Sequence, residues 1–312
     1  MKEQLTSMYK IHCLNNISAA GLDLLTDDYV ITDNIDEADA ILVRSANMHD
    51  MELPESLKAV ARAGAGVNNI PLEALAERGI PVFNTPGANA NAVKELVLAG
   101  MLLASRDLIG GVEWVRENAD DENIAKTAEK EKKRFAGGEI EGKTLGIIGL
   151  GAIGKKVAQA AEALGMSVIG YDPGMDAARA QAVSENLTFV NDLAPLFEAS
   201  DLITIHVPAL PATVGMIDAD AIAQMKDGVV FLNFSRDTLV NDEAMAKALA
   251  DGKVRCYVTD FANPAVVAMD NVIVLPHLGA STAEAEDNCA KMAVAEVMDY
   301  LETGNKVHCV NM

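Results

Sequence analysis

The feature that most constrains this chain is a glycine-rich turn near the middle of the sequence. Gly149, Gly151 and Gly154 are spaced as GxGxxG, a pattern that is weak evidence by itself. Here it follows the apolar run TLGII, opens the amphipathic stretch AIGKKVAQAAEALG and leads to a second apolar run, SVIGYD. A strand, a tight turn, a helix and a second strand in this order predict a dinucleotide-binding fold, with the pyrophosphate at the helix N-terminus. The alternative is an ordinary tight turn between a strand and a helix.

The second apolar run ends at Asp172, 18 residues after Gly154. A carboxylate at this place can accept hydrogen bonds from the adenosine ribose, and it repels a 2′-phosphate. The neighbouring residues, DPGMDA, include no arginine. We therefore expect NAD rather than NADP as cofactor, the alternative being a plain turn residue before Pro173.

Length and charge restrict the class of protein. The 312 residues suggest about two domains, and a hydrophobic fraction of 50% is too high for a disordered chain. A net charge of −21 argues against nucleic acid and anionic membranes as partners. The four cysteines form no CxxC pair, so we expect no metal site, and the longest uncharged apolar helical run, Leu96–Ser105, is too short for a membrane span. The N-terminus lacks the apolar core of a signal peptide, and we expect a cytoplasmic protein.

Short apolar runs alternate with amphipathic stretches along the chain, which predicts parallel sheets covered by helices on both faces. We expect strands at 9–14, 38–43, 57–61, 81–84, 144–148, 167–171, 201–207, 229–234, 254–259, 272–275 and 306–310. We expect helices at 18–25, 71–78, 92–107, 152–164, 218–225 and 241–250, with partial helix at 113–135. A last helix begins at the capping box Ser281-Thr282-Ala283-Glu284 and ends at Gly304.

Two residues that follow apolar runs can carry chemistry. Arg236 comes directly after a predicted buried strand, and its planar guanidinium suits a carboxylate. His277 also follows a predicted strand, and an imidazole can take or give a proton near neutral pH. Ligands of parallel α/β sheets bind beyond the carboxyl ends of the strands, where both residues are expected. Each alone has a structural alternative, a surface ion pair or a turn.

Several segments together resemble the D-isomer-specific 2-hydroxyacid dehydrogenases. They are RAGAGVNNI, NTPGANANAVKELVLAGMLLASRDL, GKTLGIIGLGAIGKKVA, DLITIHVPALPATVGMI, NFSRDTLVNDEAM and LPHLGAST, and they follow the family's order over almost the whole chain. The resemblance implies two doubly wound parallel-sheet domains with a cleft between them. A Rossmann NAD-binding domain would span 94–283, and a flavodoxin-like substrate domain would combine 1–93 with 284–312.

The resemblance also assigns roles to positions. It implies catalysis by Arg236, which binds the carboxylate, and by His277, the acid/base. Residues expected to contact NAD are Gly149, Gly151, Ala152, Ile153, Gly154, Asp172, His206, Pro208, Phe234, Ser235, Asp260, Gly279 and Ala280. Residues expected near the substrate are Arg44, Ser45, Ala63, Gly64, Ala65 and Gly66, the last four through backbone amides.

One position departs from the family pattern. The family places a glutamate before a proline to orient the histidine, and this chain has Asn263 before Pro264. Asparagine can hydrogen-bond an imidazole but carries no charge. We expect catalysis to persist, with Asn263 or another acid orienting His277.

The resemblance implies NAD-dependent oxidation of a small phosphorylated hydroxy acid, with 3-phospho-D-glycerate as the first candidate. Its phosphate would need local cations, for which the sequence offers Arg44, Arg62, Lys94 and the cluster 132–134. The family's interface position for residues 94–108 and the stretch that follows implies a homodimer. Two alternatives stay open: a hydroxypyruvate or glyoxylate reductase, and an NAD-sensing scaffold without turnover.

Overall fold

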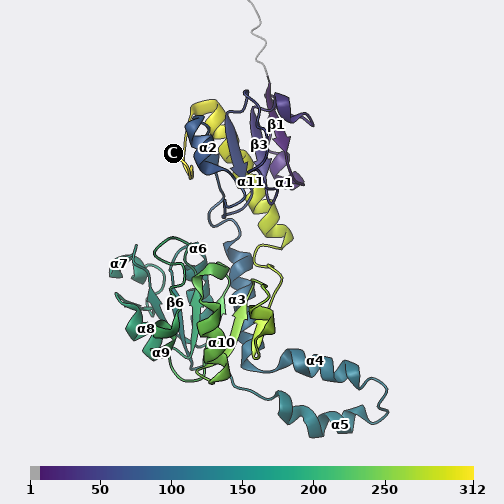
Figure 1. The fold of residues 1–312 in the computed structure, drawn as a ribbon, viewed down its shortest axis with the longest axis vertical. Coiled ribbons are helices and arrows are strands. Elements are labelled where there is room, and N and C mark those ends of the chain that lie inside the picture. The colour runs from purple at the N-terminus through teal and green to yellow at the C-terminus, as the bar shows by residue number, and fades with distance from the viewer. Residues whose placement is uncertain (1–7) are drawn as a thin grey trace, which may run out of the picture. The chain divides into compact units, whose positions relative to one another are not determined.

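The computed structural model describes residues 8–312 of the chain. Contacts divide the chain into two compact units (Figure 1). Unit 1 combines the chain up to Ala92 with Ala280–Met312, and unit 2 is Val93–Gly279. The predicted crossings lay after residues 93 and 283, and the observed ones lie after residues 92 and 279.

Unit 1 is built around a five-stranded sheet with the order β2-β1-β3-β4-β5, in which every pair is parallel. Its strands are β1 (Tyr9–Cys13), β2 (Tyr29–Ile31), β3 (Ala40–Val43), β4 (Ala59–Arg62) and β5 (Val82–Phe83). Its helices are α1 (Ala19–Leu22), α2 (Leu72–Glu77) and α11 (Ala283–Thr303), with a 3-10 turn at Ile35–Glu37. This strand order is that of flavodoxin-like folds.

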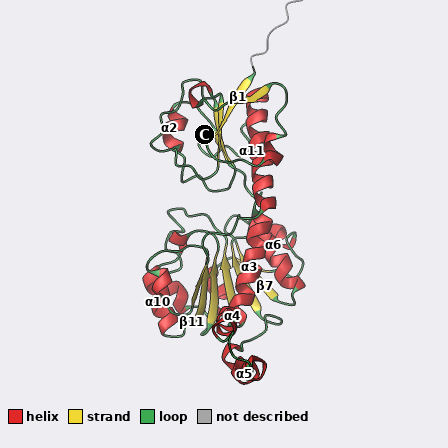
Figure 2. Cartoon of the chain, turned by 90° about the vertical axis from the view of Figure 1, so that its right-hand side faces the viewer, coloured by secondary structure: helices red, strands yellow, loops and turns green. Residues whose placement is uncertain are grey.

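Each face of the unit 1 sheet is covered by a separate apolar core. On one face, Ala293 and Val294 of α11 pack with Leu42 of β3. On the other face, Leu75 of α2 packs with Ile41 and its neighbours. Figure 2 shows the long helix α11 running along this sheet. Because adjacent residues of β3 enter opposite cores, the strand is buried on both sides and reads as a continuous apolar run.

Unit 2 holds a seven-stranded parallel sheet with the order β12-β11-β10-β9-β6-β7-β8. Its strands are β6 (Thr144–Ile148), β7 (Ser167–Tyr171), β8 (Thr188–Val190), β9 (Leu202–Ile205), β10 (Val229–Asn233), β11 (Val254–Thr259) and β12 (Val272–Val274). The covering helices are α3 (Ala90–Ser105), α6 (Ala152–Ala163), α7 (Ala177–Gln181), α8 (Leu193–Ala199), α9 (Ala219–Ala223) and α10 (Asp242–Ala250), with 3-10 turns at Asp237–Leu239 and Val266–Ala268. The order reverses between β6 and β9, which marks the switch point where this fold class binds ligands.

Alternate residues of the unit 2 strands face different helices. Val230 and Leu232 of β10 belong to the core that contains α3 and α6. Phe231 of the same strand belongs to the core that contains α8, α9 and α10. The helices on the two sides are visible in Figure 2. Both faces are covered, as a parallel sheet requires.

A helical arm leaves unit 2 between α3 and β6. It consists of α4 (Leu108–Glu117), α5 (Ile124–Glu131) and a 3-10 turn at Lys132–Phe135. The two helices run beside one another in Figure 1, and the rings of Trp114 and Phe135 pack with centroids 6.2 Å apart. The prediction of partial helix over 113–135 is confirmed, although the first arm helix already begins at Leu108.

Some predicted details of the fold are wrong. Lys306–Val310 forms no strand, because only Cys309 makes an isolated bridge, to Phe83. The last helix is capped by Thr282, whose side chain accepts a hydrogen bond from the Ala285 N–H, and not by Ser281. The edge strands β2 and β8 and the helices α7 and α8 were not predicted. Within residues 8–312, no helix combines the length and apolarity that a membrane span requires.

Candidate functional site

The glycine turn has the geometry that a pyrophosphate cradle needs. Gly149 has φ +94°, and a Cβ there would lie 2.4 Å from the His206 carbonyl oxygen. A Cβ on Gly154 would lie 2.0 Å from the Gly149 carbonyl oxygen, so glycine is required for the helix to approach the turn. Gly151 is the N-cap of α6, makes no side-chain cap bond, and has open space where a Cβ would lie. The first N–H groups of α6, from Ala152 and Ile153 onward, therefore face an open position suited to an anion.

Asp172 ties the glycine turn to the end of β7. Its Oδ2 accepts a hydrogen bond from the Leu150 N–H at 2.8 Å, and its Oδ1 accepts one from the Gly174 N–H at 2.8 Å. A carboxylate has about four lone-pair positions, so each oxygen retains capacity for a hydroxyl donor. Asp172 lies beside the glycine turn and is only half-buried, so its carboxylate is accessible to a ribose hydroxyl.

Three predicted residues follow adjacent strands of the unit 2 sheet. Arg236 comes after β10, Asp260 after β11 and His277 after β12. The strands are parallel neighbours, so their carboxyl ends meet at one edge of the sheet. The glycine turn follows β6 at the same edge. The fold thus brings the predicted cofactor and catalytic residues of this unit to the edge of the sheet where the carboxyl ends of its strands lie.

Arg236 is half-exposed, and its Nη1 donates to the neighbouring Ser235 carbonyl oxygen at 2.6 Å. No carboxylate pairs with its guanidinium within the described part of the chain. Its backbone is fixed, because the Arg236 carbonyl oxygen accepts from the side-chain amide of Asn233 at 2.8 Å. An arginine held in place without an acidic partner can bind an anionic ligand.

His277 lies in a loop that Asp260 holds in an unusual conformation. His277 has φ +58°, in the left-handed region that is rare for residues other than glycine. Asp260 is 1% exposed; its carbonyl oxygen accepts from the His277 N–H at 3.0 Å, and its two carboxylate oxygens accept from Leu278 and Gly279 N–H groups at 2.7 Å. The imidazole is exposed and packs edge-on against Phe261, with ring centroids 5.2 Å apart. A buried carboxylate thus fixes the backbone of the loop that carries the exposed imidazole.

The expectation that Asn263 orients the imidazole is wrong for this geometry. Its Nδ2 donates to Asp242 Oδ2 at 2.9 Å, and its Oδ1 accepts from the Val266 N–H at 2.8 Å. Both ends of the amide therefore serve the loop after β11. Sequence reasoning missed Asp242, because it lies 21 residues away and only the fold brings it to Asn263.

His206 directly follows β9, next to the glycine turn. Its Nε2 lies 3.0 Å from the Thr204 hydroxyl oxygen, and its Nδ1 is buried without a hydrogen-bond partner among residues 8–312. Burial lowers the pKa of His206 to about 3. The ring is therefore neutral near neutral pH and cannot exchange protons there, which leaves His277 as the candidate acid/base.

Other predicted cofactor contacts have structural roles. Phe234 is a core residue: a Cβ on Gly100 of α3 would lie 2.9 Å from its ring. Its assignment to the cofactor stays a prediction. The Ser235 hydroxyl donates to the Ile205 carbonyl oxygen at 2.8 Å. Pro208 lies in an exposed loop where its carbonyl oxygen accepts from Thr213 at 2.6 Å, and Ala280 begins the part of the chain that returns to unit 1.

In unit 1, only part of the predicted substrate loop offers free amides. The Ala63 N–H donates to Val43 and the Gly64 N–H donates to Arg62, both at 2.8 Å. Ala65 and Gly66 N–H groups have no partner among residues 8–312. The expectation for four available amides is thus corrected to two, those of Ala65 and Gly66.

Four of the candidate cations for a phosphate already form ion pairs. Arg44 forms an ion pair with Glu286 at 2.7 Å, and Lys94 lies 3.5 Å from Glu95. In the arm, Lys132 pairs with Glu129 and Arg134 pairs with Glu131. Exposed pairs of this kind contribute only about 0–1 kcal/mol, so a phosphate can compete for the cations. The Ser45 side chain is exposed beside Arg44.

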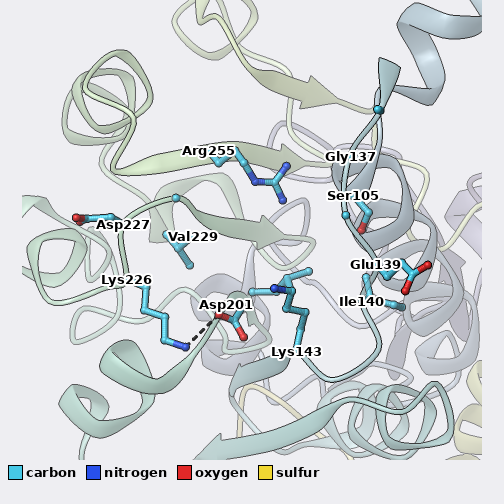
Figure 3. A pocket seen from close by; sticks show the side chains of 14 residues that line it. Ser105, Gly137, Glu139, Ile140, Lys143, Asp201, Lys226, Asp227, Val229 and Arg255 are labelled. Carbon is cyan, nitrogen blue, oxygen red and sulfur yellow. Dashed lines mark hydrogen bonds and ion pairs between the residues drawn. The ribbon is translucent and has the colours of Figure 1, made fainter. Parts of the chain in front are cut away.

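A polar pocket of about 510 Å³ lies elsewhere in unit 2 (Figure 3). It is lined by residues at the amino-terminal ends of β9, β10 and β11, such as Asp201, Val229 and Arg255. Lys226 pairs with Asp201 at 3.0 Å across its floor, and Arg255 donates to the Ala104 carbonyl oxygen at 2.9 Å. The pocket thus lies at the opposite edge of the sheet from the glycine turn, and it is not the cofactor site.

Comparisons with known proteins agree with this arrangement. Residues 98–279 match the family model described as D-isomer specific 2-hydroxyacid dehydrogenase, NAD binding domain. A D-3-phosphoglycerate dehydrogenase of Methanocaldococcus jannaschii is 37% identical over 90% of this chain and 53% of its own length. A hydroxypyruvate reductase of Thermotoga maritima is 38% identical over 81% of both chains. The structure of an NAD+-bound 3-phosphoglycerate dehydrogenase in Entamoeba histolytica has a TM-score of 0.75 and 25% identity, covering 98% of this chain and 99% of that one.

The chain spans about half the length of the first phosphoglycerate dehydrogenases that it matches. The family model, however, covers more than half of this chain, and it falls on the unit that carries the glycine turn, Asp172, Arg236 and His277. Two parallel-sheet units and an NAD-binding domain with these residues identify the chain as a member of the D-isomer-specific 2-hydroxyacid dehydrogenase family.

Proposed function

We propose that this protein is an NAD-dependent dehydrogenase of D-2-hydroxy acids, and that its substrate is 3-phospho-D-glycerate, oxidised to 3-phosphohydroxypyruvate in the first step of serine biosynthesis. The observation that carries the proposal is the placement of two residues at the sheet edge that also holds the glycine turn: Arg236, which has no carboxylate partner among residues 8–312, and the exposed His277. The phosphoglycerate dehydrogenases among the relatives support the choice of substrate.

His277, Arg236 and Asp260 have separate roles in the proposed reaction. The glycine turn and Asp172 would hold NAD, which would supply the hydride acceptor for the carbon that carries the hydroxyl group. His277 takes the hydroxyl proton, since its exposed imidazole can act as a general base toward a substrate hydroxyl. The Arg236 guanidinium holds the substrate carboxylate and orients the hydroxyl-bearing carbon. Asp260 holds the backbone of the loop that carries His277 through the N–H groups of Leu278 and Gly279.

Unit 1 contributes to substrate binding in this proposal. The free N–H groups of Ala65 and Gly66 donate to the carboxylate. Arg44 exchanges its partner Glu286 for the substrate phosphate, with Ser45 beside it. Both groups follow the carboxyl ends of neighbouring strands, β4 and β3.

Substrate competition tests the proposal. NADH formation is measured with 3-phospho-D-glycerate, D-glycerate and D-lactate, and NADH consumption with phosphohydroxypyruvate, hydroxypyruvate and glyoxylate. We expect turnover of the phosphorylated pair above all others. A preference for hydroxypyruvate or glyoxylate would instead support the second candidate function, a 2-oxoacid reductase, which the Thermotoga relative favours. NAD binding without turnover of any compound would support the scaffold alternative and reject both enzymes.

Cofactor choice gives a prediction for Asp172. Asp172→Asn retains an oxygen for one of the two backbone N–H groups but removes the charge that repels a 2′-phosphate. We expect the ratio of kcat/KM for NAD over NADP to fall by about 10-fold or more, on the scale of one lost discriminating contact. Asp176→Asn is the matched control, since Asp176 is a nearby acid whose side chain caps α7. An unchanged ratio in Asp172→Asn, or an equal change in the control, would contradict the assignment.

The arm predicts a homodimer. Leu108, Val112 and Val115 share one face of α4 and are 44%, 52% and 50% exposed. A contiguous apolar stripe on an exposed helix indicates a surface that another protein buries, and we propose that a second copy of the chain buries it. The wild type should sediment at twice the 33.0 kDa chain mass, and Val112→Glu with Val115→Glu should sediment as a monomer. Val267→Glu, at another exposed valine, should leave the dimer intact; a wild-type monomer would reject the proposal.

A further inference from the structure

The loop that carries Arg44 and Ser45 is held by one side chain from a neighbouring strand. Asn15 lies just after β1, which pairs with β3, and residues 44–46 lie just after β3. The Asn15 Oδ1 accepts hydrogen bonds from three successive backbone N–H groups, those of Arg44 at 2.9 Å, Ser45 at 3.0 Å and Ala46 at 3.0 Å. Consecutive N–H groups that converge on one point form a concave nest.

The acceptor in this nest is the protein's own amide oxygen. The three N–H groups are therefore satisfied before any ligand arrives, and they are not available to a substrate anion. The Asn15 oxygen carries no charge and does not neutralise Arg44. The charge of the Arg44 guanidinium is instead compensated by the carboxylate of Glu286, with which it pairs. What Asn15 fixes is thus the backbone from which Arg44 and Ser45 extend.

The rest of the loop is fastened around this point. The Arg44 carbonyl oxygen accepts from Arg62 Nε at 2.9 Å, so the peptide groups of Arg44 are bound on both sides. The Ala46 carbonyl oxygen accepts from Asn69 Nδ2 at 2.8 Å. The loop then enters the core at Met48, which is fully buried. Because the bonds from Arg62 and Asn69 go to carbonyl groups, Asn15 is the acceptor on which the N–H groups of residues 44–46 depend.

We infer that Asn15 is a positioning residue for substrate binding, acting through the backbone of Arg44 and Ser45. The inference rests on the proposed function, in which these two residues bind the hydroxy acid. Loss of the acceptor would leave three N–H groups unpaired and let the loop rearrange. The effect should fall on the affinity for the hydroxy acid and not on NAD, since the glycine turn and Asp172 belong to unit 2.

Three variants separate this role from general stability. Asn15→Ala removes the acceptor, and Asn15→Asp restores an oxygen at the same distance. Asn34→Ala is the matched control, because the Asn34 Oδ1 also accepts a backbone N–H in unit 1, from Asp36 at 3.2 Å, at an exposed turn. The readouts are hydrogen exchange of the amides of residues 44–46, KM and kcat for 3-phospho-D-glycerate, and NAD affinity.

We expect Asn15→Ala to raise KM by about 10-fold, with kcat changed by less than about threefold and NAD affinity unchanged. Amide exchange at 44–46 should accelerate in Asn15→Ala and return toward the wild-type rate in Asn15→Asp, which should also recover part of the KM. An unchanged KM in Asn15→Ala, or an equal rise in Asn34→Ala, would overturn this inference and leave the proposed function standing. A wild-type protein that turns over no 2-hydroxy acid would overturn the proposed function and this inference with it.

Discussion

Replacing His277 by alanine should lower kcat by about 10²–10⁴-fold, the usual contribution of a general acid or base. NAD affinity should not change, because Asp260 binds the backbone N–H groups of Leu278 and Gly279, which the substitution retains. His277→Asn should lose the same activity. Asparagine tolerates the left-handed conformation better than alanine, so this second variant separates the lost imidazole from backbone strain at φ +58°. Stopped-flow NADH formation and a fluorescence titration with NADH measure the two quantities.

His12→Ala is a suitable control for this substitution. Its Nδ1 contacts the Thr32 carbonyl oxygen at 2.9 Å in unit 1, and it has no place in the proposed chemistry. It should keep the wild-type kcat. Loss of NADH binding in His277→Ala would show that this residue serves the cofactor and not the proton, and an unchanged kcat would remove it from the mechanism.

The second large effect is expected at two glycines of the same turn, for different reasons. Gly154→Ala places a Cβ 2.0 Å from the Gly149 carbonyl oxygen, so the turn and α6 must separate. Overpacking against backbone should cost about 3 kcal/mol of unfolding free energy and abolish NAD binding. Gly151→Ala meets no atom within 4 Å and has a φ of −66° that alanine adopts freely. It should melt as the wild type does, yet bind NAD about 10-fold or more weakly, because its methyl group occupies the space of the pyrophosphate.

Thermal melts and NAD titrations of both variants distinguish a cofactor cradle from a tight turn. Gly138→Ala serves as reference, since a Cβ there also meets no atom within 4 Å and the residue lines the pocket at the opposite edge of the sheet from the turn. If Gly151→Ala bound NAD with full affinity, the open space above α6 would not be where the pyrophosphate lies. If Gly154→Ala were as stable as the wild type, the close approach of helix and turn would not be required.

Much of the fold could be predicted from local pattern. Strands with a mostly buried interior, such as Thr144–Ile148 and Val254–Thr259, appear as mostly apolar runs, and the structure has both with the predicted bounds. The three-residue edge strands Tyr29–Ile31 and Thr188–Val190 were missed because one side of each strand lacks a neighbour and the pattern is short. The segment 306–310 has the composition of a strand, but a strand also needs a continuous partner, and only Cys309 finds one.

The sequence by itself determined which chemical groups are available and at which strand ends they lie: the glycine turn, Asp172, Arg236 and His277 follow from spacing along the chain. Only the tertiary structure decided how they are held. Asn15 reaches the loop of Arg44 across 29 residues, Asn263 turns to Asp242, Phe234 enters the core, and His206 is kept neutral by burial. Spacing is a property of the chain, whereas a hydrogen bond or a desolvated ring depends on which distant residue the fold brings within about 3 Å, and that choice is made by packing.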